Sequence, residues 1–347
     1  MRVMVAMSGG VDSSVAALLL RDEGYDVVGV TMKLWGGESD SGCCSVSDVD
    51  DARRVAQQLG IDHHVFNFGD DFEAHVVEPY LADHIAGRTP NPCIECNRHL
   101  KFDTLLRRSD ALGFDAVATG HHARRVASAD AGWRIARGAD AEKDQSYVLY
   151  PVTSSVLDRV LFPLGAMTKP EVRAIATGLG LRTADKPDSQ DVCFITNAAG
   201  RAAFLGDRIP LRPGRVVDLD GTQVGKVEAM EMVTVGQRKG LDLAGGADRR
   251  YVVDVDTNAA VVTVGSKADL DVAELEIDEM VWADQPVSGA LTAQCSAHGQ
   301  ANAAAVETAD GGRSVRLTWD RPQRRVAPGQ SVVLYDGDVV VGGGLVR

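Results

Sequence analysis

A serine- and glycine-rich string near the start of the chain has the composition of a phosphate-binding loop. Ala6-Met7-Ser8-Gly9-Gly10-Val11-Asp12-Ser13-Ser14 follows an apolar run and precedes a helical pattern. Glycines let backbone N–H groups turn toward an anion, and a helix N-terminus attracts negative charge. The serine hydroxyls can reach phosphate oxygens, and Asp12 suits a pyrophosphate that carries Mg²⁺. Because the string has neither the Lys of a Walker loop nor the pattern G-x-G-x-x-G, we expect a different class of nucleotide site.

Three cysteines are placed where they could carry out sulfur or redox chemistry. Cys93 and Cys96 form a C-x-x-C pair in a proline-containing stretch, and Cys193 lies in a polar segment. A thiolate is a nucleophile, and two cysteines can pass on sulfur by forming a disulfide. The same three side chains could instead ligate an iron–sulfur cluster with one open position. Zinc is less favoured because no second cysteine pair follows. The histidines that could fill a zinc site are His99, His121 and His122.

The elements that must position these residues follow from the hydrophobic pattern. Residues 1–204 alternate short apolar runs with helical periodicity, which predicts a doubly wound parallel sheet covered by helices on both faces. Ligands of such sheets bind at the carboxyl ends of the strands. The predicted strands are residues 2–6, 25–32, 64–68 and 116–119, and the predicted helices are residues 13–23 and 49–59.

Beyond residue 205 the pattern changes to short β-rich runs separated by Gly and Pro. Their regular spacing predicts barrels or sandwiches. Asp220-Gly221 and Asp336-Gly337 are predicted hairpin turns. The predicted strands are residues 215–218, 232–235, 251–256, 261–265, 275–282, 303–306, 314–319, 331–335 and 339–346.

Composition excludes several classes of protein. The chain has 347 residues, 45% of them apolar and 24% charged, which is ordinary for a globular protein. A net charge of −13 argues against a uniformly basic nucleic-acid-binding surface, although a local basic patch is compatible with it. There is no apolar run long enough to span a membrane, and the first apolar run is too short for a secretory signal, so we expect a cytoplasmic protein. Six cysteines are too few for a disulfide scaffold, and we interpret Cys295 as a packing residue.

The first string resembles the pyrophosphate loop of the PP-loop ATP pyrophosphatase superfamily, and an ordered set of further motifs resembles one family within it, the bacterial tRNA-specific 2-thiouridylases. The resemblance covers essentially the whole chain. Its motifs are Gly87-Arg88-Thr89-Pro90-Asn91-Pro92-Cys93-Ile94-Glu95-Cys96-Asn97, Ala118-Thr119-Gly120-His121-His122-Ala123-Arg124, Lys143-Asp144-Gln145-Ser146-Tyr147, Asp188-Ser189-Gln190-Asp191-Val192-Cys193-Phe194 and Gly236-Gln237-Arg238-Lys239-Gly240-Leu241.

The resemblance implies ATP-dependent replacement of the C2 oxygen of the tRNA wobble uridine by sulfur. ATP would convert the oxygen into an adenylate, and a persulfide on Cys193 would attack C2 with Cys96 as its catalytic partner. A cysteine desulfurase or a sulfur carrier would supply the sulfur. The resemblance places ATP, with Mg²⁺, on Ala6, Met7, Ser8, Gly9, Gly10, Val11, Asp12, Ser13, Met32 and Gly120.

The same resemblance implies that tRNA binds across all three domains, with the target base extruded from its stack. The domains would be a nucleotide-binding catalytic domain at 1–204, a small central β-rich domain at 205–270 and a C-terminal β-barrel at 271–347. The residues implied to contact the RNA or its target base are Asn91, Pro92, Cys93, His121, Lys143, Asp144, Gln145 and Gln330.

Local charge is consistent with RNA binding, but two segments depart from the family pattern. Residues 311–325 and 98–108 are rich in Arg and Lys, and such patches neutralise phosphates. Some relatives have Asp where this chain has Cys93, so a general acid–base role there does not transfer unchanged. Residues 294–299 are less basic and less aromatic than in relatives.

Two other classes of function remain open from the residues alone. A PP-loop amidotransferase or ligase would need no cysteine pair, and an RNA-binding module on a relict nucleotide fold would not release pyrophosphate. The intact loop and the spaced cysteines favour the thiolation hypothesis over both.

Overall fold

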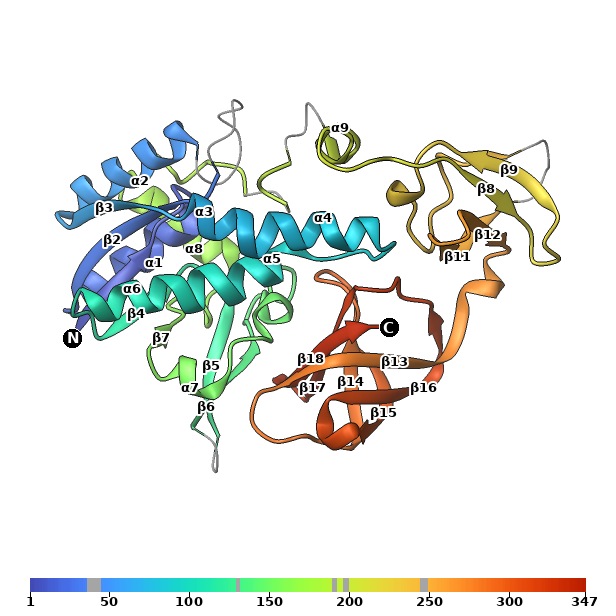
Figure 1. Cartoon of the computed structure of the whole chain (residues 1–347). Helices are drawn as coiled ribbons and strands as arrows, with labels where there is room; N and C mark the ends of the chain where they lie inside the picture. Colours follow the sequence, from blue (N-terminus) through green and yellow to red (C-terminus); the bar gives the residue numbers. More distant parts are fainter. Residues whose placement is uncertain (36–44, 129–131, 189–191, 196–199, 244–248) are drawn as a thin grey trace.

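The computed structural model describes residues 1–35, 45–128, 132–188, 192–195, 200–243 and 249–347. Figure 1 shows a helix-covered parallel sheet, a small β domain to one side of it, and a β-barrel that lies beside the N-terminal domain. The motif residues Ser189, Gln190 and Asp191 lie outside the described residues.

A five-stranded parallel sheet forms the N-terminal domain, with strand order β3-β2-β1-β4-β7. From the central strand β1 the chain first adds β2 and β3 on one side and then β4 and β7 on the other. The sheet is therefore doubly wound, as predicted. The strands are β1 (Arg2–Ala6), β2 (Asp26–Lys33), β3 (Asp62–Asn67), β4 (Ala116–Thr119) and β7 (Val160–Leu161).

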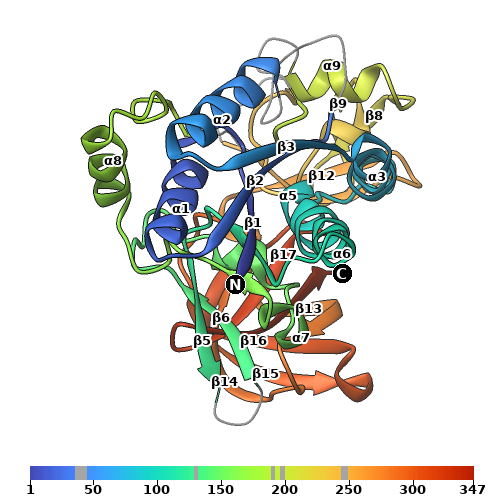
Figure 2. The same cartoon turned by 90° about the vertical axis from the view of Figure 1, so that its left-hand side faces the viewer.

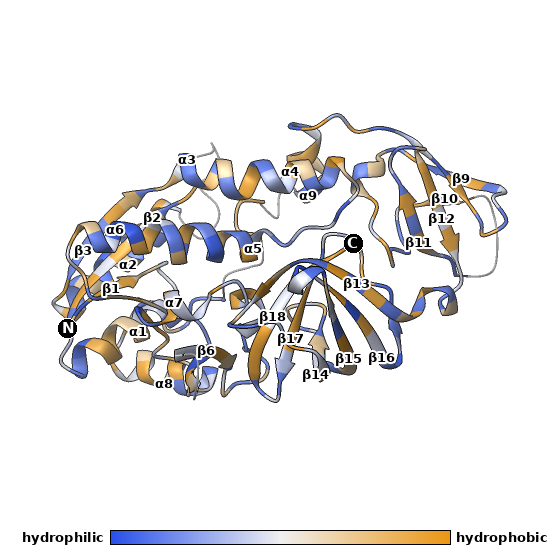
Figure 3. Ribbon diagram, turned by 60° about the horizontal axis from the view of Figure 1, so that its bottom comes forward, coloured by the Kyte–Doolittle hydropathy of each residue, from blue (hydrophilic) through white to orange (hydrophobic). Residues whose placement is uncertain are grey.

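Alternate side chains of β1 enter two different cores, as the two-residue repeat of a strand requires. Val3 and Val5 pack under the helices on one face, whereas Met4 packs under those on the other. Figure 2 shows the two helical layers, and Figure 3 shows their mixture of hydrophilic and hydrophobic residues. One face carries α1 (Val11–Asp22), α2 (Val46–Leu59) and α8 (Lys169–Gly178); the other carries α3 (Gly69–Phe72), η1 (Glu73–Val77), α4 (Glu78–Ile85), α5 (Pro92–Glu95), η2 (Cys96–Thr104) and α6 (Leu105–Ala111).

The second half of the chain forms two β domains, as its turn-rich pattern predicts. The central domain is a mixed sheet of order β10-β9-β8-β12-β11. In the C-terminal domain β13 pairs with both β16 and β18, which closes the sheet into a barrel. The central strands are β8 (Gly214–Val217), β9 (Gln223–Val227), β10 (Asp242–Leu243), β11 (Tyr251–Asp256) and β12 (Val261–Gly265). The barrel strands are β13 (Asp271–Trp282), β14 (Gly289–Gln294), β15 (Asn302–Ala309), β16 (Ser314–Arg324), β17 (Ser331–Asp336) and β18 (Val339–Val346).

A hairpin of the N-terminal domain joins the barrel to the parallel sheet. Strands β5 (Ala123–Ser128) and β6 (Gly132–Arg137) pair with each other, and Ala136 of β6 pairs with Val339 of β18. Tyr147 and Tyr150 are buried in the same hydrophobic cluster as Tyr335 of the barrel. The barrel is therefore packed onto the N-terminal domain through a shared core.

One predicted strand is wrong, and the β5–β6 hairpin, β7, β9, β10 and β14 were not predicted. Residues Met230–Met232 form a short 3-10 helix, η4, in place of the predicted strand at 232–235. The buried Glu231 carboxylate accepts hydrogen bonds from Arg212 there, and this tertiary contact overrides the local apolar pattern. The β5–β6 hairpin and β14 were missed because their Arg-, Ala- and Gly-containing sequences have weak strand propensity. Both predicted Asp-Gly turns are confirmed, with Gly221 and Gly337 at positive φ.

Candidate active site

The serine–glycine loop connects β1 to α1 at the carboxyl edge of the sheet. Gly9 has φ of 73°, and a Cβ there would come 2.2 Å from the carbonyl oxygen of Asp48, so only glycine fits. Gly10 is the N-cap of α1. The hydroxyl oxygen of Ser13 accepts a hydrogen bond from the N–H of Ser8 at 3.2 Å and donates to the carbonyl of Gly10 at 3.1 Å. The loop is thus held compact over the helix N-terminus, which suits it to an anion.

Asp12 lies in the first turn of α1 and is held by two basic side chains. The Nζ of Lys169 donates to both carboxylate oxygens, at 2.8 and 2.7 Å, and Nε2 of His122 lies 3.2 Å from Oδ1. Burial alone would raise the pKa of Asp12, but the hydrogen bonds from His122 and Lys169 hold it below its ordinary value. The carboxylate is therefore ionised at neutral pH, with its charge neutralised by Lys169.

Met32 and Gly120 lie beside this loop at the ends of the neighbouring strands. Ala6 pairs with Val30 on one side and with Thr119 on the other, so Met32 and Gly120 both lie just beyond this register. A Cβ on Gly120 would come 2.7 Å from the backbone nitrogen of Ser13. The predicted strand-end position of both residues is confirmed.

Lys186 ties the loop to the start of α2. Its Nζ donates to the carbonyl oxygen of Gly9 at 2.9 Å and contacts the carboxylates of Asp48 at 2.5 Å and Asp51 at 2.8 Å. Burial works against the charged amine, but the hydrogen bonds from it to Asp48 and Asp51 raise the pKa of Lys186. Helix α2 and the segment before Cys193 therefore brace the loop from one side.

Cys96 and Cys193 belong to the hydrophobic cluster on the second face of the sheet. Cys96 opens the π-helical segment η2 and is buried, while Cys193 is half-buried and packs against the same cluster. Ala6 and Met32 border that cluster too. The structure therefore places the two predicted catalytic cysteines on the side of the sheet to which the ends of β1 and β2 also contribute.

The chain around Cys193 is anchored on one side and strained on the other. Phe194 is buried against a set of aromatic rings. Val192 has φ of 57°, a conformation that costs a β-branched residue about 1–3 kcal/mol. The rings that surround Phe194 are Trp35, Phe72, Tyr80 and Phe204.

Cys93 occupies a different position from the other two cysteines. It lies in the short helix α5, where Asn91 caps the helix by accepting the N–H of Cys93 at 3.1 Å. Over the described parts of the chain, no three or more His, Cys, Asp or Glu side chains are grouped as metal ligands. The iron–sulfur cluster and zinc alternatives for Cys93, Cys96 and Cys193 stay predictions, which the iron and zinc content of the purified protein tests.

His121 is buried and neutral. Burial, with Lys101 and His122 nearby, lowers its pKa well below the ordinary value. Lys101 has only donor hydrogens, and its Nζ lies 3.4 Å from Nε2 of His121, so Nδ1 carries the proton and donates to the Thr119 hydroxyl at 2.7 Å. The imidazole is therefore a buried, neutral side chain next to Gly120 in the chain.

The Lys143-Asp144-Gln145 segment lies between the loop and the barrel. Lys143 pairs with Asp188 at 2.8 Å, and the side chain of Gln145 accepts the N–H of His122 at 2.9 Å. Asp144 is buried and accepts hydrogen bonds from Arg137 at 2.9 Å and from Ser146. These side chains couple the site to the barrel, a role that the sequence did not indicate.

Arg137 completes this junction between the two domains. Its guanidinium lies 3.9 Å from the ring centroid of Tyr335 and donates to the side chain of Gln294 at 2.8 Å. Gln294 belongs to the segment that departs from the family pattern. Gln330, farther along the barrel, makes backbone hydrogen bonds with Ala327 and Val346.

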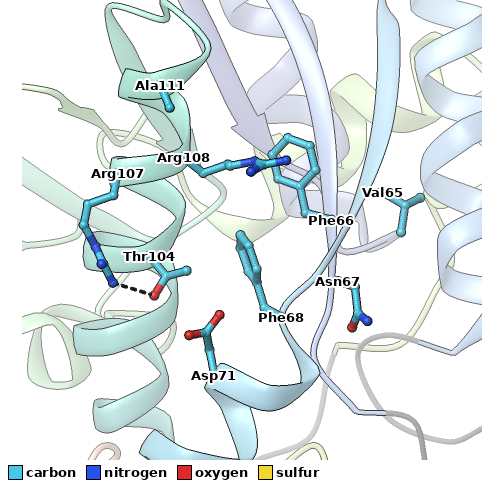
Figure 4. A pocket seen from close by; sticks show the side chains of 9 residues that line it. All are labelled: Val65, Phe66, Asn67, Phe68, Asp71, Thr104, Arg107, Arg108 and Ala111. Atoms are coloured by element: carbon cyan, nitrogen blue, oxygen red, sulfur yellow. Dashed lines mark hydrogen bonds between the residues drawn. The ribbon is translucent and has the colours of Figure 1, made fainter.

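The two predicted basic patches are partly used inside the protein. Lys101 faces His121, Arg316 pairs with Glu276 at 3.6 Å, and Arg325 donates to the carbonyl of Val253 in the central domain at 3.1 Å. Arg107 and Arg108 line an open groove of about 570 Å³ beside the edge strand β3 (Figure 4). This groove lies on the outside of the parallel sheet and is separate from the loop.

Lys169 and Lys186 are site residues that sequence reasoning missed. Thr168-Lys169-Pro170-Glu171 is a capping-box sequence, and the structure shows the box at the start of α8. That signal predicts where the helix begins. It says nothing about the ion pair to Asp12, which arises only when α8 packs beside α1.

Comparisons with known proteins cover the chain from end to end. A family model described as "tRNA methyl transferase HUP domain" matches residues 1–197. Models described as "tRNA methyl transferase PRC-barrel domain" and "Aminomethyltransferase beta-barrel domain" match residues 202–266 and 272–346. No helix in the described part of the chain is both long and apolar enough to cross a membrane.

Three similar curated proteins are each named "tRNA-specific 2-thiouridylase MnmA". The relative from Herpetosiphon aurantiacus is 44% identical over 99% of this chain and 97% of its own length. That from Heliobacterium modesticaldum is 45% identical over 99% of this chain and 92% of its own length. That from Moorella thermoacetica is 45% identical over 99% of both chains.

Proposed function

The chain belongs to the tRNA-specific 2-thiouridylase family, and from this membership we propose that it catalyses ATP-dependent 2-thiolation of the wobble uridine, position 34, of tRNA. The observation that supports the proposal is the serine–glycine loop at the carboxyl end of β1, together with Cys96 and Cys193 in the hydrophobic cluster that Ala6 and Met32 also border. A nucleotide loop activates the base oxygen, and a cysteine pair supplies sulfur.

The first step activates the uracil. The C2 oxygen attacks the α-phosphorus of ATP, and pyrophosphate leaves. Backbone N–H groups of residues 8–13 and the N-terminus of α1 stabilise the phosphates. Gly120 and Met32 border the space for the nucleoside. Mg²⁺ would arrive with the triphosphate and neutralise part of its charge.

The second step exchanges oxygen for sulfur. The terminal sulfur of a Cys193 persulfide attacks C2, and the former C2 oxygen leaves on AMP. The Cys96 thiolate then attacks Sγ of Cys193, so the bond between Cys193 and the transferred sulfur breaks. A Cys96–Cys193 disulfide forms, and sulfur remains on C2 as the thiocarbonyl. A thiol reductant then reduces the disulfide to the two cysteine thiols and is itself oxidised, and a cysteine desulfurase or a sulfur carrier loads a new persulfide sulfur onto Cys193.

The RNA contacts belong to the proposal as well. Asn91, Pro92 and Cys93 would face the target base, and Lys143, Gln145, His121 and Gln330 would lie along the path of the tRNA. Asp144 would act indirectly, by fixing the position of the neighbouring residues Lys143 and Gln145, since its carboxylate is already hydrogen-bonded to Arg137. With domain boundaries after residues 204 and 270, the serine–glycine loop, Cys96 and Cys193 all belong to the first domain. The barrel, the third domain, would bind the tRNA.

The direct test uses an unmodified tRNA transcript, ATP and a persulfide donor, with nucleosides measured by mass spectrometry. We expect 2-thiouridine at position 34, and we expect Cys193→Ser to abolish it while ATP still binds. Cys295→Ala is the matched control, because burial raises the pKa of Cys295 to about 12 and makes it unreactive. An added methyl group in place of the oxygen-to-sulfur exchange would refute the proposal and favour the methyltransferase named in the family models.

A ligase that adenylates a carboxylate is the second candidate. It would use the same loop but would leave Cys96 and Cys193 without a role, so Cys96→Ala would be active. Iron content and visible absorption of anaerobically purified protein separate the persulfide route from a cluster route. Stoichiometric iron that is lost in Cys93→Ser would refute the persulfide route.

A further inference from the structure

The segment before Cys193 is held in place by three charged side chains. Arg182 pairs with Asp51 at 2.8 Å, and Lys186 contacts Gly9, Asp48 and Asp51. Asp188, the last described residue before Cys193 in this stretch, differs from the other two. It is an acid. Two of its partners, Lys169 and Arg173, lie on α8, and the third, Lys143, belongs to the RNA-contact segment, Lys143-Asp144-Gln145.

Three cations converge on the Asp188 carboxylate. Lys169 Nζ lies 2.8 Å from Oδ1, Arg173 contacts the same oxygen at 2.9 Å, and Lys143 donates to Oδ2 at 2.8 Å. Arg173 also donates to the carbonyls of Ala184 and Lys186 at 2.6 and 3.1 Å. Helix α8 therefore binds residues 184–188 through their backbone as well as through the Asp188 side chain. A network of several charges holds its geometry better than one exposed ion pair.

The contacts close into a ring around the site. Asp188 and Asp12 share Lys169, Asp12 contacts His122, and His122 exchanges hydrogen bonds with Gln145 at 2.9 Å in both directions. Lys143, two residues before Gln145, returns to Asp188. The ring therefore connects the nucleotide loop, the RNA-contact segment and the chain that leads to Cys193.

From this ring we propose that Asp188 is a positioning residue for the sulfur-transfer step. By binding Lys169 and Lys143 together, it fixes the start of the Cys193 segment against the nucleotide loop and the bound RNA. The inference rests on the proposed function, because it assigns Asp188 to the delivery of Cys193 to an adenylated base.

The location of Asp188 predicts which step depends on it. Among the described residues, its carboxylate forms no ion pair or hydrogen bond with the serine–glycine loop itself, and Lys169 bridges it to Asp12. Adenylation needs the loop and should persist without Asp188. Attack on C2 needs the persulfide sulfur at the right distance, and a misplacement of about 1 Å can cost about a hundredfold in rate. The electrostatics agree, because although burial alone would raise the pKa of Asp188, hydrogen bonds from Lys143 and Lys169 hold it far below the ordinary value.

The test measures two products of the same reaction. Asp188→Asn keeps the size of the side chain and removes its charge. We expect 2-thiouridine formation to fall by about 10- to 100-fold, and tRNA-dependent pyrophosphate release to fall less than about threefold. In the variant, water replaces sulfur at C2, so AMP leaves and uridine is regenerated. The ratio of pyrophosphate to 2-thiouridine should rise by about tenfold or more over that of the wild type.

Two further variants make the result specific. Asp185→Asn is the matched control, since Asp185 is exposed in the same stretch and none of the ion pairs in the described residues includes it. It should leave the product ratio unchanged. Asp188→Glu keeps the charge and should restore most of the coupling.

Each outcome decides between the alternatives. An equal loss of both products, or no loss of either, in Asp188→Asn would overturn the positioning role. The same follows if Asp188→Glu is as uncoupled as Asp188→Asn. Failure of the proposed function is recognised separately, because the wild-type protein would then form no 2-thiouridine at all. Thermal unfolding of each variant shows that the comparison is made on folded protein.

Discussion

Lys169 neutralises the carboxylate beside the nucleotide loop, and replacing it should weaken ATP binding through charge. Its Nζ contacts both oxygens of Asp12, and the lysine side chain is only 9% exposed. Lys169→Met removes the charge and keeps the length of the apolar stem. Asp12 is then an unpaired negative charge, apart from His122, in the first turn of the helix that receives the phosphates.

The size of the effect follows from the distance and the surroundings. Two like charges about 6 Å apart repel by about 3 kcal/mol at an effective dielectric constant of about 20. Asp12 is 31% exposed, and salt screens the pair, so we expect about 1.4–2 kcal/mol, or a rise in Kd of about 10- to 30-fold. The loss should shrink as pH falls, because burial, no longer opposed by Lys169, raises the pKa of Asp12 and favours its neutral form.

Titration calorimetry with a non-hydrolysable ATP analogue and Mg²⁺ measures the binding directly. Lys267→Met, an exposed change in the central domain, is the control and should bind like the wild type. The double variant Asp12→Asn, Lys169→Met removes the repulsion and should regain most of the affinity, although not the turnover. If Lys169→Met binds like the wild type, or if the double variant binds no better than it does, charge neutralisation is not the role of Lys169.

Three other predictions test the neighbouring contacts. Gly120→Ala should abolish ATP binding without unfolding the domain, since the added Cβ would come 2.7 Å from a backbone nitrogen of α1. Gly178→Ala is the control: its added Cβ meets open space, and the variant should bind ATP normally in the same calorimetric assay. Arg137→Leu should lower the free energy of unfolding by about 2 kcal/mol and raise the Kd for tRNA. It removes the stack on Tyr335 and the hydrogen bond to Gln294, which join the barrel to the N-terminal domain, and also the hydrogen bond to Asp144. Unchanged values in denaturant titration and filter binding would contradict this. Burial and the charge of a nearby arginine lower the pKa of His84 to about 4. Between pH 6.5 and 4 the unfolded state therefore gains a proton that the folded state does not, and the free energy of unfolding should fall by about 2–3 kcal/mol as the pH is lowered through this window. Thermal unfolding of His84→Gln should show a smaller fall.

The local parts of the site could be predicted from the sequence because they depend on short-range patterns. The loop, the strand before it and the helix after it occupy consecutive residues, and the ends of parallel strands must meet at one edge. Met32 and Gly120 could therefore be placed beside Ala6 without a structure. The predicted strand at residues 339–346 agrees with β18 for the same reason, since it opens with three valines shortly after the predicted Asp-Gly turn.

The contacts that charge the site could not be predicted in this way. Lys169 reaches Asp12 only because α8 packs against α1, and Asp188 is linked to Asp12 only through Lys169. No periodicity encodes which lysine faces which acid. Asp144 was expected to contact RNA, but the structure places its carboxylate in the junction with the barrel. The short helix at Met230–Met232 replaced a predicted strand because a buried Glu231 needs Arg212, and that requirement is tertiary.

The central claim is that the base oxygen departs on the nucleotide and sulfur takes its place. The most direct measurement uses tRNA whose wobble uridine carries a heavy-oxygen label at C2, incubated with ATP and a persulfide donor. We predict that the label appears in the phosphate of AMP in the same amount as 2-thiouridine forms. If 2-thiouridine forms while AMP stays unlabelled, the oxygen is not adenylated and the proposed mechanism is wrong.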